Sequence, residues 1–216
     1  MDLTGPRIEP IGGGPARSAV LLLHGYGADG NDLIGLAAEW APALPETLFY
    51  SPHAPFPCEA AGFGRQWFGF QNKRQDLVAP LEVATAARII DREVDGFLKE
   101  LKLPPVRLVL AGFSQGAMMA LHIGLRRAGP VAGILAYSGL LMAPELLEMQ
   151  IRSKPPVLLI HGDRDTVVPP ESLPEAEGTL TRLGVPVEAL LRPGLAHGID
   201  PEGVAQGRRF LERVLG

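Results

Sequence analysis

The sequence is poor in cysteine and in long apolar runs, and each shortage excludes a class of protein. Cys58 is the single cysteine among 216 residues. One thiol forms no intramolecular disulfide and supplies too few thiolates for a structural zinc site. The longest apolar stretches hold about seven residues, against the roughly 20 that a membrane-spanning helix needs. The first ten residues, MDLTGPRIEP, lack the basic segment and apolar run of a signal peptide. These absences favour a cytoplasmic protein without membrane insertion.

The charge of the chain excludes a second class of protein. Lys and Arg total 20 against 24 Asp and Glu, the net charge is −4, and no basic cluster stands out. Nucleic-acid binding requires basic residues that neutralise phosphates, so this composition argues against it. The 46% hydrophobic and 20% charged residues are values typical of a globular protein. The length favours a single domain that spans residues 1–216.

Short aliphatic runs alternate with helical patterns along the chain. The runs that we expect to form strands are Ala19–Leu23, Thr47–Tyr50, Val106–Ala111, Val131–Tyr137, Val157–Ile160 and Val185–Leu191. The expected helices are Asp32–Ala41 with Asn31 as N-cap, Val83–Leu101, Gln115–Ala128, Leu173–Leu183 and Val204–Leu215. Continuous Val/Ile/Leu runs are typical of parallel strands buried on both faces. The pattern therefore predicts an α/β fold with a mostly parallel central sheet and helices on both faces.

Two long connections, Pro52–Pro80 and Ser138–Gln150, interrupt this alternation and are rich in large apolar side chains. Long connections in a compact domain tend to be functional. The side chains that we assign to a substrate pocket are Phe63, Trp67, Phe68, Leu140, Leu141 and Met142, together with Val167 from a later loop; Phe56 and Phe70 lie nearby in the sequence. They predict a pocket for an apolar acyl or aryl group. The alternative is that they only pack over the edges of the sheet.

The strongest chemical signal is Gly112-Phe113-Ser114-Gln115-Gly116, which directly follows one expected strand and precedes one expected helix. This is the context of a nucleophile elbow, a sharp turn that presents a serine at the carboxyl end of the sheet. Side chains at the two glycine positions would clash with the neighbouring strand and helix. The pattern predicts that Ser114 is a nucleophile.

A serine nucleophile needs a base, and three histidines follow Ser114. His122 lies eight residues on in the same helix, more than about 10 Å along the axis from the turn, which favours a packing role. His161 precedes the acid candidates, against the order serine, acid, histidine of this architecture. His197 follows the last expected strand in a glycine-flanked loop. We therefore predict His197 as the general base.

The acid that orients the base is less clear. Asp200 is only three residues from His197, too close to approach it from a separate loop. Asp163 and Asp165 both follow the strand Val157–Ile160, and reasoning from the residues does not separate them.

An oxyanion hole requires backbone N–H donors aimed at the substrate oxygen. The residue after the nucleophile, Gln115, supplies one, and Tyr26 in the glycine-rich loop after the first expected strand is predicted to supply the other. We interpret His24 as a structural residue under that loop. Cys58, beside an acid and away from any helix N-terminus, is interpreted as an inert loop thiol.

Taken together, these motifs carry a family resemblance. They read LLLHGYGADGNDL from Leu21, QWF from Gln66, AGFSQGAMMAL from Ala111, HGDRDTVVP from His161 and PGLAHG from Pro193. From about Ala19 to Leu215 the chain resembles the phospholipase/carboxylesterase family of α/β-hydrolases, which includes bacterial carboxylesterases and acyl-protein thioesterases. The resemblance implies an α/β-hydrolase fold.

The same resemblance implies roles for individual residues. It implies Ser114 as nucleophile, His197 as base, and Tyr26 and Gln115 as the oxyanion donors, and it selects Asp165 over Asp163 as the acid. Two positions depart from the family: Gly69 stands where an acid usually follows the WF pair, and Leu195-Ala196 precedes His197 where the family often has GMGH. Both departures affect the expected pocket rather than the chemistry.

The sequence thus predicts a serine carboxylesterase that hydrolyses short- to medium-chain carboxylic esters through an acyl-enzyme, without metal or cofactor. The alternatives are an acyl-protein thioesterase or lysophospholipase with the same Ser-His-Asp triad, and a non-catalytic binding protein of hydrolase fold. The expected partner is a small-molecule ester, and the resemblance makes a homodimer an additional expectation.

Overall fold

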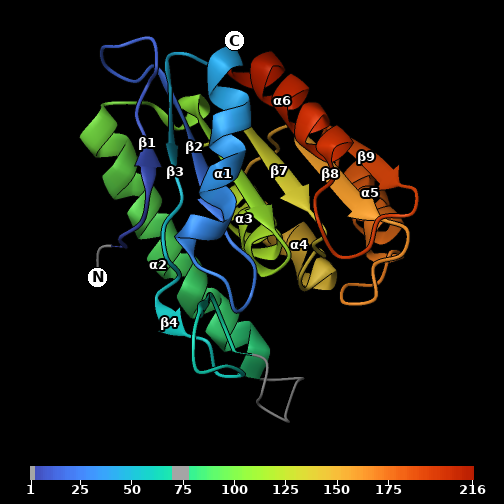
Figure 1. Cartoon of the computed structure of the whole chain (residues 1–216). Helices are drawn as coiled ribbons and strands as arrows, with labels where there is room; N and C mark the ends of the chain where they lie inside the picture. The colour runs from blue at the N-terminus through green and yellow to red at the C-terminus, as the bar shows by residue number, and fades with distance from the viewer. Residues whose placement is uncertain (1–2, 70–77) are drawn as a thin grey trace.

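The computed structural model describes residues 3–69 and 78–216, so Phe70 lies outside the described residues. Its centre is a seven-stranded sheet in the order β1-β3-β2-β6-β7-β8-β9 (Figure 1). The strands are β1 (Arg7–Ile8), β2 (Ser18–Leu23), β3 (Thr47–Tyr50), β6 (Leu108–Phe113), β7 (Gly133–Tyr137), β8 (Val157–Gly162) and β9 (Val187–Arg192). The edge strand β1 is antiparallel to β3, and the other neighbouring strands are parallel. A separate short hairpin joins β4 (Phe56–Pro57) to β5 (Arg65–Gln66).

The aliphatic runs form these strands because both faces of the sheet are covered. All six residues of β2 are buried, and their side chains alternate between two cores. Leu21 and Leu23 belong to one core, whereas Val20 and Leu22 belong to the other. A strand that is apolar on both faces therefore needs no polar alternation. This confirms the predicted mostly parallel α/β fold.

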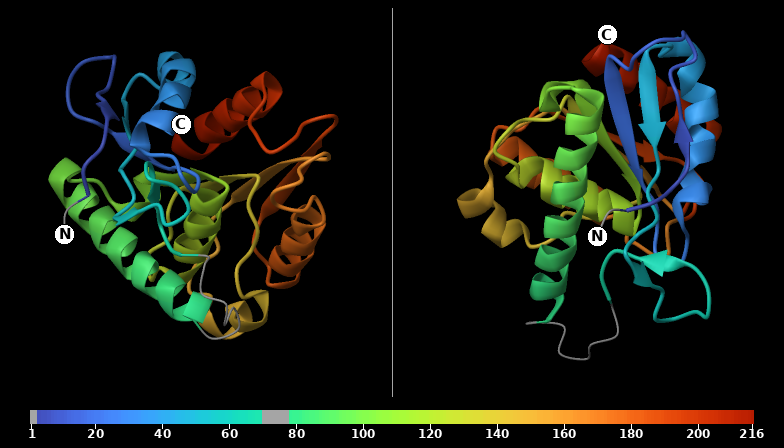
Figure 2. Two further views of the ribbon diagram at one scale, coloured as in Figure 1. Left: turned by 60° about the horizontal axis from the view of Figure 1, so that its bottom comes forward. Right: turned by 90° about the vertical axis from the view of Figure 1, so that its left-hand side faces the viewer.

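Helices cover the two faces of the sheet. They are α1 (Gly30–Trp40), α2 (Val78–Leu101), α3 (Gln115–Arg126), α4 (Pro144–Gln150), α5 (Ser172–Arg182) and α6 (Pro201–Leu215). The apolar stripes of α1 and α6 bury against one face, and those of α2, α3 and α5 bury against the other. Figure 2 shows α1 and α2 on opposite sides of the sheet. Within the described ranges, no helix is long and apolar enough to cross a membrane.

Several boundaries differ from those expected. The N-cap of α1 is Asp29 rather than Asn31, because the Asp29 backbone is extended and its carboxylate accepts the Asn31 N–H. The strand expected from Val106 starts at Leu108, since Pro105–Arg107 form a 3₁₀ turn. The last helix starts at Pro201 rather than at Val204, because Asp200 caps it.

The connection Ser138–Gln150 is not wholly irregular, since it contains α4. This short helix begins with Pro144, a residue suited to the first turn because it needs no N–H partner there. The fold brings the carboxyl ends of β2, β6, β8 and β9 to one edge of the sheet, because these strands are parallel to their neighbours. The loops that carry the candidate site leave from this edge.

Candidate active site

Ser114 occupies the turn between β6 and α3 with φ 53° and ψ −118°, a conformation that non-glycine residues rarely adopt. The two flanking glycines are sterically required. A Cβ on Gly112 would lie 2.4 Å from the carbonyl carbon of Gly116, and one on Gly116 would lie 1.8 Å from the carbonyl oxygen of Leu23. The Ser114 N–H donates to the carbonyl oxygen of Tyr137 at 2.9 Å. The turn thus has the strained geometry that a nucleophile elbow requires, and the role of Ser114 stays a prediction.

His197 lies beside this elbow and is bonded to Asp165. Its Nδ1 atom is 2.7 Å from Oδ2 of Asp165, and its ring centroid is 4.8 Å from that of Phe113, the residue before Ser114. Because a carboxylate accepts, Nδ1 carries the proton in the neutral ring, and Nε2 remains an acceptor. The arrangement gives His197 the tautomer that a general base for serine requires.

The Asp165 side chain is fully buried, and several N–H groups donate hydrogen bonds to its carboxylate. Its Oδ1 atom accepts the N–H groups of Val167 and Val168 at 2.8 and 2.9 Å. Burial by itself raises the pKa of this carboxyl, but the hydrogen bonds from His197, Val168 and Val167 outweigh it and hold the pKa of Asp165 below its ordinary value. The carboxylate is therefore ionised at neutral pH.

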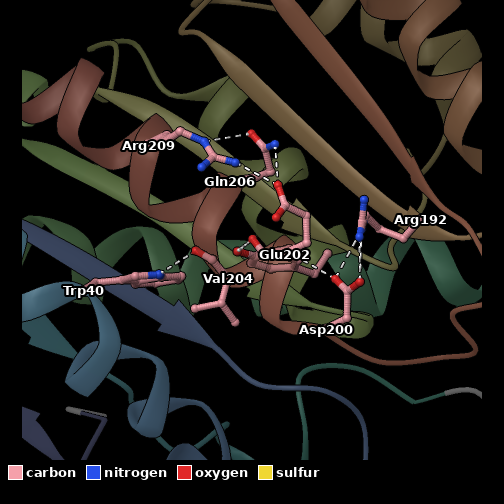
Figure 3. A network of polar contacts seen from close by, with 9 residues as sticks. Trp40, Arg192, Asp200, Glu202, Val204, Gln206 and Arg209 are labelled. Atoms are coloured by element: carbon pink, nitrogen blue, oxygen red, sulfur yellow. Dashed lines mark hydrogen bonds and ion pairs between the residues drawn. The ribbon is translucent and has the colours of Figure 1, made fainter.

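The structure separates the three aspartates that follow Ser114. Asp163 accepts the Gly194 N–H at 2.6 Å and so holds the base of the loop that carries His197. Asp200 accepts the Gly203 N–H as the N-cap of α6 and forms an ion pair with Arg192 of β9 at 2.9 Å (Figure 3). Asp165 is the one of the three that contacts His197.

The far end of the same loop is anchored by α6. Figure 3 shows Trp40 of α1 donating its indole N–H to the carbonyl oxygen of Val204, at 3.0 Å. The Arg192–Asp200 pair and the Trp40 bond therefore fix the start of α6. The His197 loop runs between two held ends.

The residues expected to form an oxyanion hole lie on both sides of Ser114. Gln115 is the first residue of α3, and the first N–H groups of a helix have no acceptor within it. Across from it, a Cβ on Gly25 would lie 3.6 Å from the Ser114 Cβ, so the loop that contains Tyr26 approaches the serine closely. The Gly27 N–H donates to the carbonyl oxygen of Arg65 at 2.9 Å, which holds this loop against β5.

The Gln115 side chain makes contacts that the sequence did not reveal. Buried beneath the site, its Oε1 atom accepts the Trp67 N–H at 2.8 Å, and its Nε2 atom donates to the carbonyl oxygen of Phe68 at 2.7 Å. The Trp67 indole donates to the carbonyl oxygen of His24 at 2.8 Å. The one sequence signal that could have indicated this network is a polar residue at the first position of an otherwise apolar helix.

His24 has a structural arrangement, as expected. Its Nε2 atom accepts the Ala54 N–H at 3.0 Å, and its Nδ1 atom lies 2.8 Å from the carbonyl oxygen of Gly25. Burial lowers the pKa of His24, which keeps its ring neutral. His24 thus supports the loop that holds Tyr26.

The expected pocket residues have diverse surroundings. Phe63 and Val167 are 79% and 66% exposed, whereas Leu141 is nearly buried and Leu140 and Met142 are half-buried beside it. Phe68 lines a cleft of about 390 Å³ together with Phe56 and Thr85. Trp67, in contrast, has no exposed surface. Its contacts make it a support for His24 and Gln115 rather than a wall of the pocket.

Cys58 is buried, and its backbone N–H donates to the carbonyl oxygen of Gly64 at 3.0 Å. Across residues 3–69 and 78–216, no group of three or more His, Cys, Asp or Glu side chains is arranged to hold a metal ion.

Comparisons with known proteins agree with this fold. The profile of the Phospholipase/Carboxylesterase family matches residues 6–215. Acyl-protein thioesterase 1 of Gibberella zeae is 27% identical over 92% of this chain and 91% of its own length. The crystal structure of esterase PE8 is 42% identical, with a TM-score of 0.94 and full coverage of both chains. The Bacillus cereus carboxylesterase, 15% identical with a TM-score of 0.80 over 98% of this chain and 94% of that one, shares the fold.

Proposed function

Because the chain belongs to the phospholipase/carboxylesterase family of hydrolases, we propose that it cleaves short- to medium-chain carboxylic esters by acyl transfer to Ser114. The observation that carries the proposal is the 2.7 Å contact between His197 and Asp165. His197 also packs against Phe113, in the sharp turn that presents Ser114. In this proposal Asp165 orients His197 and stabilises its charged form, and His197 activates Ser114.

The first half of the reaction transfers the acyl group. The Ser114 hydroxyl attacks the ester carbonyl while Nε2 of His197 takes its proton. The backbone N–H groups of Tyr26 and Gln115 bind the negative oxygen of the tetrahedral intermediate. The intermediate then expels the alcohol, which receives the proton from His197, and an acyl-Ser114 ester remains.

Water completes the cycle. His197 deprotonates a water molecule, the hydroxide adds to the acyl-Ser114 carbonyl, and Ser114 leaves with the proton returned by His197. The acid product departs and the enzyme is regenerated. No step requires a metal ion or an organic cofactor.

The acyl or aryl group is assigned to the apolar side chains around this edge of the sheet. We place it against Leu140, Leu141, Met142 and the buried Phe68, with the exposed Phe63 and Val167 at the rim. The half-buried Leu140 and Met142 and the exposed Phe63 and Val167 offer apolar area to a substrate that is apolar itself. If Leu141→Ala leaves the preference for acyl-chain length unchanged, this assignment is wrong.

A second candidate rests on a specific finding. Relatives at 27–28% identity over 92% of the chain are named acyl-protein thioesterase 1. The same proposed machinery would cleave a thioester or a lysophospholipid, because the attack on the carbonyl is identical. Relative rates on a palmitoyl thioester and on short oxygen esters separate the two candidates.

The test is a panel of p-nitrophenyl esters from acetate to palmitate, run with wild-type protein and Ser114→Ala. A Ser114-dependent maximum at short chains supports the carboxylesterase, and a maximum at long chains supports the second candidate. A fluorophosphonate should label wild-type protein at Ser114 and should not label Ser114→Ala. Ligand binding without turnover, unaffected by Ser114→Ala, would instead indicate a binding protein of hydrolase fold.

A further inference from the structure

Two histidines converge on one carboxylate oxygen. Oδ2 of Asp165 lies 2.7 Å from Nδ1 of His197 and also 3.2 Å from Nε2 of His161. His161 belongs to β8, four residues before Asp165, and is 1% exposed. The reaction proposed above uses the first of these contacts and leaves the second unexplained.

The surroundings of His161 determine where its proton lies. Its Nε2 atom is 3.0 Å from the carbonyl oxygen of Val168. A carbonyl oxygen only accepts, so Nε2 must carry a hydrogen, and in the neutral ring Nδ1 carries none. The same Nε2 atom is 3.2 Å from Oδ2 of Asp165, so the N–H that bonds to the Val168 carbonyl oxygen is also in electrostatic contact with the carboxylate.

Val168 links the two side chains through its backbone. Its N–H donates to Oδ1 of Asp165 at 2.9 Å, and its carbonyl oxygen is the acceptor next to His161. Together with the Val167 N–H these contacts hold Oδ1, and the His197 contact holds Oδ2. The Asp165 side chain therefore has no freedom to turn away from His197.

We propose that His161 is a positioning residue, whose Nε2–H holds the Val168 carbonyl oxygen and thereby the adjacent Asp165 carboxylate in line with His197. The proposal rests on the function proposed above, in which His197 becomes positively charged during turnover. An N–H donor suits this role, because its hydrogen bond to the Val168 carbonyl oxygen sets Nε2 at 3.2 Å from the carboxylate. It also fixes the turn from Asp165 to Val168, on which the orientation of His197 depends.

The proposal distinguishes a donor from a mere space-filling ring. Glutamine has an N–H donor at about the reach of imidazole Nε2, whereas leucine fills similar volume without a donor. We expect His161→Leu to lower kcat by about 10–100-fold with KM changed less than about twofold, because a misaligned catalytic group slows the chemical step more than binding. His161→Gln should keep kcat within about fivefold of wild type.

The matched control is His122→Leu, the same substitution at a histidine in α3 that has no contact with Asp165 or His197. Its Nδ1 atom has no hydrogen-bond partner among the described residues. We expect its kcat to be unchanged. The proposal is overturned if His161→Leu keeps the wild-type kcat, or if His161→Gln loses as much activity as His161→Leu while both unfold at the wild-type temperature.

A spectroscopic arm does not depend on turnover or on the folding of the leucine variant. Nuclear magnetic resonance of ¹⁵N-histidine-labelled wild-type protein at neutral pH reports the tautomer of each ring, and the signals absent from His161→Gln identify His161. The expected result is the Nε2–H tautomer. A Nδ1–H tautomer, which leaves Nε2 without a hydrogen, overturns the proposal, whatever the activity. Turnover that persists in Ser114→Ala would instead overturn the proposed function. The tautomer measurement would then still test the contacts of His161, independently of that function.

Discussion

The Oδ2 atom of Asp165 lies 2.7 Å from Nδ1 of His197, although 32 residues separate the two along the chain. The sheet explains the contact. Strands β8 and β9 are parallel neighbours, and Gly162 pairs with Arg192 where both strands end. The two loops therefore leave the sheet at the same height, one carrying Asp165 and the other His197.

Asp165→Asn should lower kcat by about 10³–10⁴-fold with little change in the unfolding temperature. An amide can turn its NH₂ toward His197, which forces the ring into the tautomer that cannot accept a proton from serine. Steady-state kinetics on p-nitrophenyl acetate measures the effect.

Asp163→Asn is the matched control, because Asp163 lies in the same loop but bonds to the Gly194 N–H instead. An asparagine oxygen can accept the same N–H, so we expect kcat within about fivefold of wild type. Equal losses in the two variants would show that the Asp165–His197 contact has no special role.

Gly116→Ala should unfold at a much lower temperature than wild type or fail to fold. The added Cβ would lie 1.8 Å from the Leu23 carbonyl oxygen, a backbone atom that cannot move without displacing β2. We expect a loss of several kcal/mol in the free energy of unfolding, measured by urea denaturation.

Gly178→Ala is the corresponding control. Gly178 lies within α5, and a Cβ there would meet no atom within 4 Å. Alanine is favoured over glycine in a helix interior, so this variant should gain about 0.5–1 kcal/mol. If Gly116→Ala were as stable as Gly178→Ala, the steric account of the elbow would be wrong.

The fold was predictable because its signals are local. A continuous apolar run predicts a doubly buried strand, and β2, β3, β6, β7, β8 and β9 all follow such runs. Strand β1 was missed because a two-residue strand has no periodicity, and its pairing with β3 depends on residues distant in the sequence. Helix α4 was missed because seven residues are too few for a clear helical stripe.

Chain order and glycine spacing made only part of the site predictable. The elbow at Ser114 and the loop of His197 follow from those patterns, whereas Asp163 and Asp165 share one loop and one residue type. The distinction comes from where each carboxylate points, which tertiary contacts decide. The roles of these residues in catalysis, and the single domain, remain predictions.

Gln115→Leu should reduce the free energy of unfolding by about 2–4 kcal/mol. The substitution removes the acceptor of the buried Trp67 N–H and one donor to the Phe68 carbonyl oxygen. A buried N–H that loses its acceptor cannot recover its hydration, which is the main cause of the expected loss. Urea denaturation measures the change.

The same substitution at Gln206 is its control. Gln206 lies in α6, where its amide donates to Glu202 in an exposed bond. Water replaces that bond, so Gln206→Leu should change stability by less than about 0.5 kcal/mol. Equal effects of the two substitutions would contradict a special role for the Gln115 side chain.

The stability of the protein should fall between pH 7 and pH 5 because of His122. Burial, with a smaller contribution from the charge of Arg126, lowers the pKa of His122 to about 4. In the unfolded chain the pKa returns to about 6.5, so acidification protonates the unfolded state first and favours it. The protein has its full stability above the pKa of the unfolded chain. At pH 5 it has lost about 2 kcal/mol of its free energy of unfolding.

His122→Gln removes the titrating group and should lose about 2 kcal/mol less than wild type over this interval. The comparison is between changes with pH, so any effect of the substitution on packing cancels. Arg126→Gln should fall between the two, because it removes the positive charge and leaves the buried ring. Urea denaturation of the three proteins at both pH values gives the differences. If wild type and His122→Gln lose the same stability, the folded protein accepts the proton at His122 as readily as the unfolded chain does, and burial does not keep this ring neutral.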